Sequence, residues 1–289
     1  MCIPYIYCWN NGAGNQLLTM LNILYYSFYF KKFKGIKFPT NQYFTPKTLT
    51  NEEISDENLT CACDNEHDIT RRINPCSDWF CTGISVLKNL FEKHVTYNFS
   101  SDITHSENDI GIHIRSGDIF GGNVHWEYVQ PPLDYYIQIM NKNPDKSIII
   151  VHDTNPRKPY WRNPVLDKII EHIDTNNLHN VKIQSKSIRE DISALASCKT
   201  IFCAMGTFSL MCYIISPIAK QIYIPHYMHN KKRGKNWFVL DDSDKNVVKE
   251  IEIKDYIRVG SWKNTPEQQE LMLNYKMNPV EIEKLSINI

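Results

Sequence analysis

An arginine directly follows a short apolar segment in the sequence IGIHIRSGD at residues 110–118. In a strand, alternate residues point to opposite faces, so the three isoleucines would face one side and Gly111, His113 and Arg115 the other. A guanidinium stays charged at physiological pH and offers a rigid fork of donors that fits phosphate oxygens. The spacing therefore predicts a strand over residues 110–114 that delivers Arg115 to an anionic ligand, beside the turn at Gly117 and Asp118.

Glycines near the N-terminus could bind the same kind of ligand. Gly12 and Gly14 precede a helix-like segment, and glycines before a helix N-terminus expose backbone N–H groups that bind anions. The alternative is a plain turn in which Asn15 caps the helix. The sequence matches neither a P-loop nor the complete dinucleotide-binding pattern.

Polar residues also follow later apolar runs. Asp153 ends the run at 147–152 and could accept hydrogen bonds from a nucleotide base or ribose, although a capping aspartate is an equal alternative. Thr207, Phe208 and Ser209 lie between a strand-like and a helix-like segment, where hydroxyls and N–H groups suit a phosphate or ribose but also serve as an N-cap. Asp191 lies near the start of a helix, a position that favours acids whatever the function.

Two sets of residues have the types, but not the setting, of metal ligands. Cys61, Cys63, Cys76 and Cys81 do not form the pairs of closely spaced cysteines that hold structural zinc. Asp242 and Asp244 lie in a turn-like tract, so we expect a solvated turn there. No metal site is predicted.

The composition limits the classes of function. The chain has 289 residues, is 42% hydrophobic and carries 32 basic and 32 acidic residues. This size suffices for one large domain or two modest ones, and the balanced charge argues against a nucleic-acid or membrane-surface protein. The N-terminus lacks the pattern of a secretory signal, and no apolar run reaches the ~20 residues that span a bilayer. We expect a soluble, cytoplasmic protein without a membrane anchor, whose nine cysteines are mostly buried thiols.

Strand-like and helix-like segments alternate after residue 108. We expect strands at 3–9, 110–114, 147–152, 181–184, 200–204 and 221–224, and helices at 15–30, 84–94, 132–141, 165–175, 188–196 and 209–216. Residues 35–80 are expected to be irregular with short helices, and residues 250–289 to add a closing strand and one or two helices. The alternation predicts an α/β fold with a parallel sheet, and the polar stretch at 96–108 predicts a domain boundary.

Four motifs in consistent order resemble those of one enzyme family. His113-x-Arg115-x-Gly117-Asp118 is similar to the His-x-Arg-x-Gly-Asp signature of the α1,2-, α1,6- and protein-O-fucosyltransferases. Residues 12–16 resemble that group's Gly-x-x-Gly-Asn-Gln loop. Residues 188–192 and 207–209 resemble its second and third nucleotide-binding motifs, and residues 130–136 (QPPLDYY) resemble bacterial-type members. The resemblance spans residues 8–225 and points to a bacterial-type or virus-encoded member.

The resemblance implies a GT-B glycosyltransferase with two Rossmann-like halves that face each other across a cleft. Residues 1–107 would form the acceptor-side half, residues 108–250 the nucleotide-sugar half, and residues 251–289 a closing segment. The family transfers L-fucose from GDP-fucose with inversion to a hydroxyl of an oligosaccharide or glycoprotein glycan, without a metal or other cofactor.

The resemblance also implies roles for single residues. Arg115 would bind the β-phosphate and stabilise the departing diphosphate, with His113 beside it in the same motif. Gly12, Gly14 and Asn15 would approach the diphosphate or sugar from the other half. The remaining donor contacts would be Asp153, Asp191, Thr207, Phe208 and Ser209.

An inverting transfer benefits from a base that takes the acceptor proton. The candidates are Asp118, His125 and Glu127, and we prefer Glu127 or His125 because they follow the motif on a loop. Position 116 is serine where many relatives carry a second basic residue that helps define the linkage, so the linkage stays open. Two alternatives also stay open: the same fold with a xylosyl, rhamnosyl or galactosyl donor, and a non-catalytic module that binds sugar nucleotides or glycans.

Overall fold

The computed structural model describes residues 4–6, 12–30, 41–47, 61–63, 82–103, 108–121, 124–153, 162–227, 242–258 and 260–287. The chain forms two compact units. Unit 1 comprises Met1–Asp102, Leu210–Ile215 and Lys235–Val247. Unit 2 comprises Ile103–Ser209, Ser216–Gly234 and Val248–Ile289.

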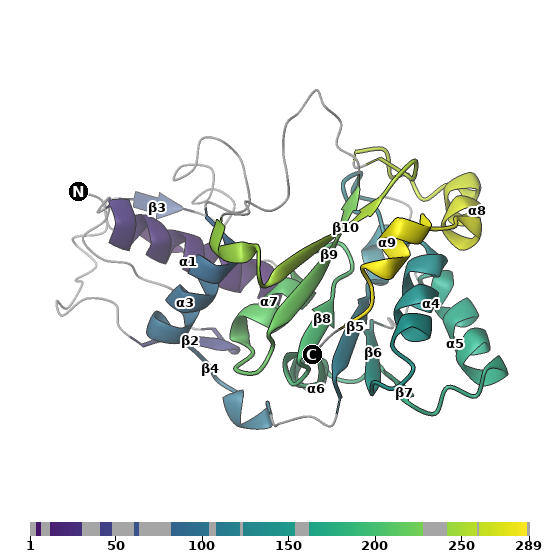
Figure 1. Cartoon of the computed structure of the whole chain (residues 1–289). Helices are drawn as coiled ribbons and strands as arrows, with labels where there is room; N and C mark the ends of the chain where they lie inside the picture. The colour runs from purple at the N-terminus through teal and green to yellow at the C-terminus, as the bar shows by residue number, and fades with distance from the viewer. Residues whose placement is uncertain are drawn as a thin grey trace. The chain divides into compact units, whose positions relative to one another are not determined.

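Unit 2 is built on a six-stranded parallel sheet in the order β10-β9-β8-β5-β6-β7 (Figure 1). Its strands are β5 (Ile110–Ile114), β6 (Ile148–His152), β7 (Val181–Gln184), β8 (Thr200–Phe202), β9 (Gln221–Tyr227) and β10 (Val248–Ile253). Counted from β5, this is the 3-2-1-4-5-6 order of doubly wound nucleotide-binding sheets. The predicted α/β fold with a parallel sheet is confirmed, and a Rossmann-like fold is compatible with it.

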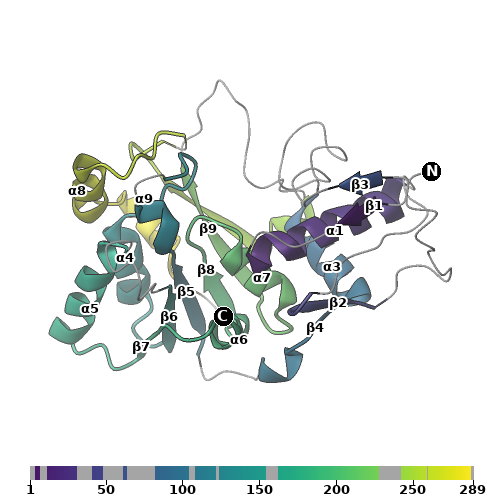
Figure 2. The same cartoon turned by 180° about the vertical axis from the view of Figure 1, so that it is seen from behind.

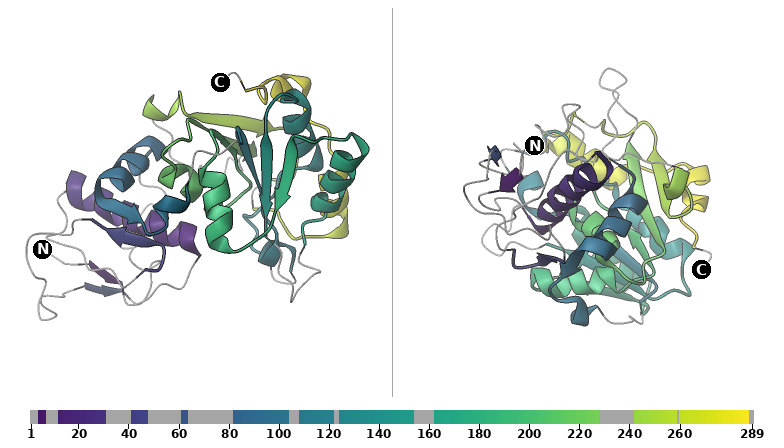
Figure 3. Two further views of the ribbon diagram at one scale, coloured as in Figure 1. Left: turned by 90° about the horizontal axis from the view of Figure 1, so that it is seen from below. Right: turned by 90° about the vertical axis from the view of Figure 1, so that its left-hand side faces the viewer.

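Helices cover both faces of this sheet. They are α4 (Leu133–Lys142), α5 (Val165–Thr175), α6 (Ile188–Ala196), α8 (Pro266–Asn274) and α9 (Pro279–Glu283), while α7 (Phe208–Ile215) begins in unit 2 and continues into unit 1. Helices α4 and α5 lie on one face and α6 on the other, as right-handed crossovers in opposite directions require (Figures 2 and 3). The closing helices α8 and α9 pack against α4. The helices predicted at 165–175 and 188–196 have the expected bounds.

Strand β5 is buried at all five residues because α6 covers its polar side. A β-carbon on Gly111 would lie 3.0 Å from both the Cys198 sulfur and Leu195 Cδ2, so glycine lets α6 approach closely. The alternation of apolar and polar residues in this strand therefore reflects two different buried environments. Central strands of parallel sheets are normally covered on both sides.

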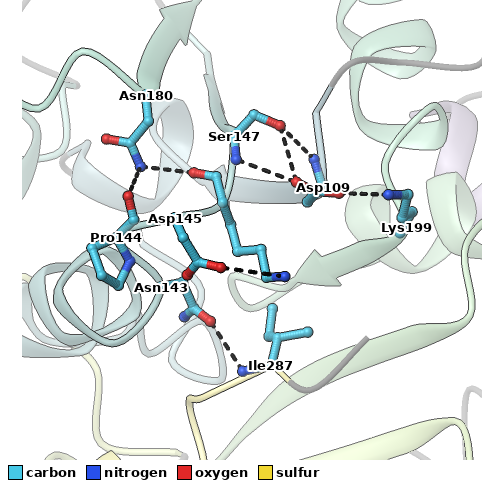
Figure 4. Close-up of polar contacts among 9 residues, drawn as sticks. Asp109, Asn143, Pro144, Asp145, Ser147, Asn180, Lys199 and Ile287 are labelled. Atoms are coloured by element: carbon cyan, nitrogen blue, oxygen red, sulfur yellow. Dashed lines mark hydrogen bonds and ion pairs between the residues drawn. The ribbon is translucent and has the colours of Figure 1, made fainter.

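The amino ends of four strands are tied together by polar side chains (Figure 4). Asp109, directly before β5, accepts a hydrogen bond from Lys199 Nζ at 2.6 Å and from Ser147 Oγ at 3.3 Å. Lys199 and Ser147 directly precede β8 and β6. Asn180, before β7, donates to the carbonyl oxygen of Lys146 at 2.7 Å. This network braces the edge of the sheet opposite to the carboxyl ends of the strands.

Removing the lysine of this network should lower stability in a pH-dependent way. The hydrogen bond from Lys199 holds the pKa of Asp109 below its ordinary value, and bonds from Ser147 and the lysine's charge add to this. The contribution is present above the unfolded pKa of about 3.9 and is lost as pH falls through the lower folded pKa. We expect Lys199→Gln to cost about 1 kcal/mol at pH 7, because solvent screens the half-exposed lysine, and less at pH 3.

Urea unfolding at both pH values would measure this difference. Lys168→Gln is the matched control, since Lys168 forms a more exposed ion pair with Glu171 and should change stability less. An equal loss at pH 7 and pH 3 would contradict the assigned role of the Asp109 carboxylate.

Within the residues that the structure describes, unit 1 contains the helices α1 and α3, most of α7 and two small sheets. Its elements are β1 (Pro4–Ile6), α1 (Ala13–Phe30), β2 (Phe44–Pro46), β3 (Cys61–Cys63), α3 (Ile84–His94) and β4 (Val95–Tyr97). Strand β1 pairs with β3 in parallel and β2 with β4 in antiparallel orientation, while α1 packs against α3. The helix predicted at 84–94 is confirmed. Strands β2 and β3 lie in the range 35–80, where irregular structure with short helices was expected; such three-residue strands are defined by their partners rather than by a sequence pattern. The rest of that range, apart from residues 41–43 and 47, lies outside the described residues.

Asp244 is not part of a solvated turn, as the sequence suggested. Its side chain is fully buried and accepts hydrogen bonds from the backbone N–H groups of Ile84 at 3.2 Å and Ser85 at 2.8 Å. It therefore caps the N-terminus of α3 from a segment about 160 residues away. Asp242 does remain exposed, in an ion pair with Lys245.

The helices in the described part of the chain include none that is long and apolar enough to cross a membrane.

Candidate functional site

Arg115 lies at the point where the order of the sheet reverses. It directly follows β5, from which the chain continues to β6 and β7 on one side and later returns to β8 on the other. Such a switch point, at the carboxyl ends of the strands, is where open α/β sheets bind ligands. The structure thus places Arg115 where its charge can meet a ligand, and its side chain is 23% exposed.

Two side chains hold the Arg115 guanidinium. Its Nη2 lies 3.3 Å from Asp118 Oδ1, and the Asp118 side chain is 69% exposed. The guanidinium carbon lies 4.1 Å from the centre of the Tyr128 ring, a cation–π contact. These two neighbours occupy the stacked face and one edge of the guanidinium and so restrain its orientation.

Gly206 lies next to Nη1, the other terminal nitrogen of the Arg115 guanidinium. A β-carbon at Gly206 would lie 2.5 Å from Arg115 Nη1, closer than any real contact of this kind. The backbone of Gly206 has φ +126°, which side-chain-bearing residues rarely adopt. The backbone conformation favours glycine in this loop, which joins β8 to α7, and any side chain here would displace the Arg115 guanidinium.

The backbone of this segment is anchored by a buried asparagine. Asn163 donates from Nδ2 to the carbonyl oxygen of Arg115 at 2.9 Å, and its backbone N–H donates to Ser116 Oγ at 3.2 Å. Asn163 is fully buried and its Oδ1 accepts from Val165 at the start of α5. Ser116 is therefore an anchoring hydroxyl for the segment that follows Arg115.

Asp153 borders the site from the neighbouring strand β6. A β-carbon at Gly117, which has φ +83°, would lie 3.3 Å from Asp153 Oδ2. Desolvation raises the pKa of Asp153 and nearby Asp191 adds to this, while His152 and Arg115 oppose it. The structure brings Asp153 into the electrostatic environment of Arg115, as expected for neighbouring strand ends.

His113 is an uncharged, buried ring rather than a second cation. Burial lowers its pKa to about 3, with the positive charges of Arg115 and His152 adding to the effect. Its ring lies 5.1 Å from that of Phe208 at the start of α7, and its Nδ1 lacks a hydrogen-bond partner among the described residues. Arg115 therefore supplies the positive charge at this strand end.

The remaining predicted residues of unit 2 lie in different settings. Asp191 is buried, and its carboxylate accepts from Lys186 N at 3.2 Å and Gln184 Nε2 at 2.9 Å, which fixes the turn before α6. Ser209 is fully buried, whereas Thr207 and Phe208 are half-buried at the start of α7. Their predicted contacts with a nucleotide remain predictions.

The two candidate bases lie on the loop between η3 (Gly117–Phe120) and α4. His125 is exposed and its Nδ1 accepts from the backbone N–H of Glu127 at 3.4 Å. Its ring contacts those of Trp126 and Tyr128. Glu127 is half-buried. The loop reaches Arg115 through Tyr128, whose ring also contacts that of His125. The role of either residue as a base stays a prediction.

The glycine segment at residues 12–16 belongs to unit 1. Helix α1 begins at Ala13, and Gln16 N–H donates to the carbonyl oxygen of Gly12 at 3.2 Å. Gly14 and Asn15 thus lie in the first turn of the helix, which corrects both the expected loop and the alternative of Asn15 as its cap. Gly12, directly before the helix, is exposed. The predicted role of this segment in binding the donor remains a prediction.

Among the residues that the structure describes, no group of three or more His, Cys, Asp and Glu side chains is arranged to hold a metal ion. Cys76, Cys81 and the side chains of Cys61 and Cys63 lie outside the described residues.

Two residues of the site, Tyr128 and Asn163, were not predicted from the sequence. Gly206 belongs to the segment between a strand and a helix from which Thr207, Phe208 and Ser209 were predicted, but its contact with Arg115 was not predicted. Tyr128 follows the candidate bases, but only the fold shows that its ring lies on Arg115. Asn163 contacts Arg115 and Ser116 only in the folded chain, and no sequence pattern marks it as part of the site.

Protein-family models, curated proteins and solved structures were all compared with the chain, and none matches it.

Proposed function

We propose that the chain is an inverting glycosyltransferase of the GT-B type that moves L-fucose from GDP-fucose to a hydroxyl of a glycan acceptor. The observation that carries the proposal is the position of Arg115, whose fork lies at the switch point of the sheet with Gly206 against it. This arrangement supports an anionic ligand at the carboxyl ends of β5 and β8. The motif resemblance narrows that ligand to a nucleotide sugar.

The start of α7 adds to the electrostatic argument. Helix α7 begins at Phe208, two residues after Gly206. The N–H groups at a helix start carry partial positive charge and favour phosphates. A diphosphate at this place would meet both these groups and the Arg115 guanidinium, while the neutral His113 adds no charge of its own.

In the proposed reaction an acceptor oxygen attacks the anomeric carbon of fucose from the side opposite to the diphosphate. The bond between that carbon and the β-phosphate oxygen breaks, and its electrons leave with GDP. The acceptor proton goes to a base, for which Glu127 and His125 are the proposed candidates. Negative charge grows on the departing oxygen, so a fixed guanidinium stabilises the transition state more than the ground state.

A panel of nucleotide sugars tests this proposal. The purified protein is offered GDP-fucose, GDP-mannose, UDP-galactose, UDP-xylose and dTDP-rhamnose in EDTA, and donor hydrolysis and transfer to a glycan mixture are measured. We expect turnover of GDP-fucose that EDTA does not abolish. Preference for a UDP or dTDP sugar would show that GDP-fucose is not the donor. Binding without any turnover would favour the non-catalytic alternative. Loss of turnover in EDTA would contradict the metal-free mechanism.

A further inference from the structure

Three aromatic rings connect the C-terminal segment of unit 2 to Arg115. We propose that Trp126, His125 and Tyr128 form a ring column that fixes the angle of the Arg115 fork, with Trp126 and Tyr128 as positioning residues. The inference rests on the proposed function, because it states how the donor-binding arginine is held.

The column is continuous from its outer to its inner end. The Trp126 and His125 rings are stacked, with centroids 5.7 Å apart and planes at 17°. The His125 and Tyr128 rings are 4.9 Å apart at 50°, and the Arg115 guanidinium carbon lies 4.1 Å from the Tyr128 centroid. These separations fall within the range in which aromatic pairs attract, so each ring restrains the next.

The outer end of the column is clamped by the C-terminal segment. A β-carbon at Gly260, which has φ +90°, would lie 3.0 Å from Trp126 Cζ3 and 3.1 Å from Cε3, so the Gly260 backbone packs against the indole. The carbonyl oxygen of Trp126 accepts from Gly260 N at 3.1 Å and from Trp262 N at 3.2 Å. The hydrogen bonds hold the backbone of Trp126, and the packing of Gly260 restrains its ring.

The C-terminal segment around Gly260 and Trp262 also contacts the segment that follows Arg115. Trp262 is buried, and its Nε1 donates to the carbonyl oxygen of Ile119 at 2.9 Å. Its ring contacts Phe120 edge to face at 5.8 Å. The C-terminal segment thus contacts both the segment after Arg115 and the outer end of the ring column. This explains why a tryptophan that is 40% exposed belongs to the site.

The column predicts that Trp126 acts on Arg115 without touching it. We expect Trp126→Ala to lower kcat for GDP-fucose roughly 3- to 30-fold, the range that corresponds to one cation–π contact, with a smaller change in KM. Trp126→Phe keeps a ring in the column and should restore most of the rate. Leu271→Ala, which truncates a similarly exposed apolar side chain on α8, is the matched control and should change neither constant.

The side-chain NMR signal of Arg115 gives a readout that needs no turnover. The Nε–H resonance, assigned by its loss in Arg115→Lys, should be shifted upfield by the Tyr128 ring and should show restricted motion. Trp126→Ala should reduce both effects, and Trp126→Phe should restore them. An Arg115 signal that is unchanged in Trp126→Ala would overturn the column.

The two readouts separate this inference from the proposed function. If the wild type turns over no nucleotide sugar but its Arg115 signal responds to Trp126→Ala, the column stands and the function is wrong. If the wild type turns over GDP-fucose, but the Arg115 signal and kcat are unchanged in Trp126→Ala, the function stands and the column is wrong.

Discussion

Arg115→Lys is expected to lower the turnover of GDP-fucose by ~10²–10³-fold, the usual cost of removing one donor that stabilises transition-state charge. Lysine keeps the positive charge but loses the fork that can bind two phosphate oxygens at once. It also loses the planar group that lies on Tyr128 at 4.1 Å. The expected loss lies mainly in kcat, because the β-phosphate carries more negative charge in the transition state than in the bound sugar nucleotide.

The fold should survive this substitution. Arg115 forms one ion pair with an exposed aspartate, and such pairs contribute about 0–1 kcal/mol. The unfolding temperature should therefore shift by a few degrees at most, about 2–4 °C for each kcal/mol in a chain of this size. Arg258→Lys, at an exposed arginine after β10, is the control and should keep full turnover. Full turnover in Arg115→Lys itself would remove Arg115 from the site.

Gly206→Ala should damage turnover and stability for two separate reasons. The new methyl group would lie 2.5 Å from Arg115 Nη1, and the end of a long side chain yields more easily than the backbone. We therefore expect the guanidinium to move and turnover to fall at least tenfold, up to the effect of Arg115→Lys itself. The backbone at φ +126° would in addition cost about 1–3 kcal/mol of stability.

A double-mutant cycle separates these two effects. In the Arg115→Lys background Nη1 is absent, so Gly206→Ala should cost much less turnover while it costs the same stability. Gly111→Ala is the matched control, because its methyl group would meet Cys198 and Leu195 under α6 and should lower stability but not the turnover of the folded protein. Equal losses of turnover by Gly206→Ala in both backgrounds would show that backbone strain, not displacement of Arg115, is responsible.

The sequence predicted most elements of unit 2 because their patterns are local. The apolar run at 147–152 and the helical spacing at 165–175 identify β6 and α5 without knowledge of their neighbours. Crossovers between parallel strands are right-handed, but this rule gives the order of the strands only if the switch point is known. The sequence does not mark that point. The α/β class could therefore be predicted, whereas the position of β8 beside β5 could not.

The site was predicted where it lies on strand ends and missed where it depends on tertiary contacts. Arg115 and Asp153 follow apolar runs, so their common edge could be inferred. Gly206, Asn163 and Tyr128 contact Arg115 from 91, 48 and 13 residues further along the chain, and no sequence periodicity encodes such contacts. Asp244 was misjudged for the same reason, since its partners are the N–H groups of a distant helix.

The most direct test of the central claim is calorimetric titration of the wild-type protein with GDP and with UDP in EDTA. The claim that Arg115 holds the β-phosphate of GDP predicts binding of GDP, clearly weaker binding of UDP, and a loss of most GDP affinity in Arg115→Lys but not in Arg258→Lys. Tighter binding of UDP, or GDP binding that Arg115→Lys leaves unchanged, would contradict it.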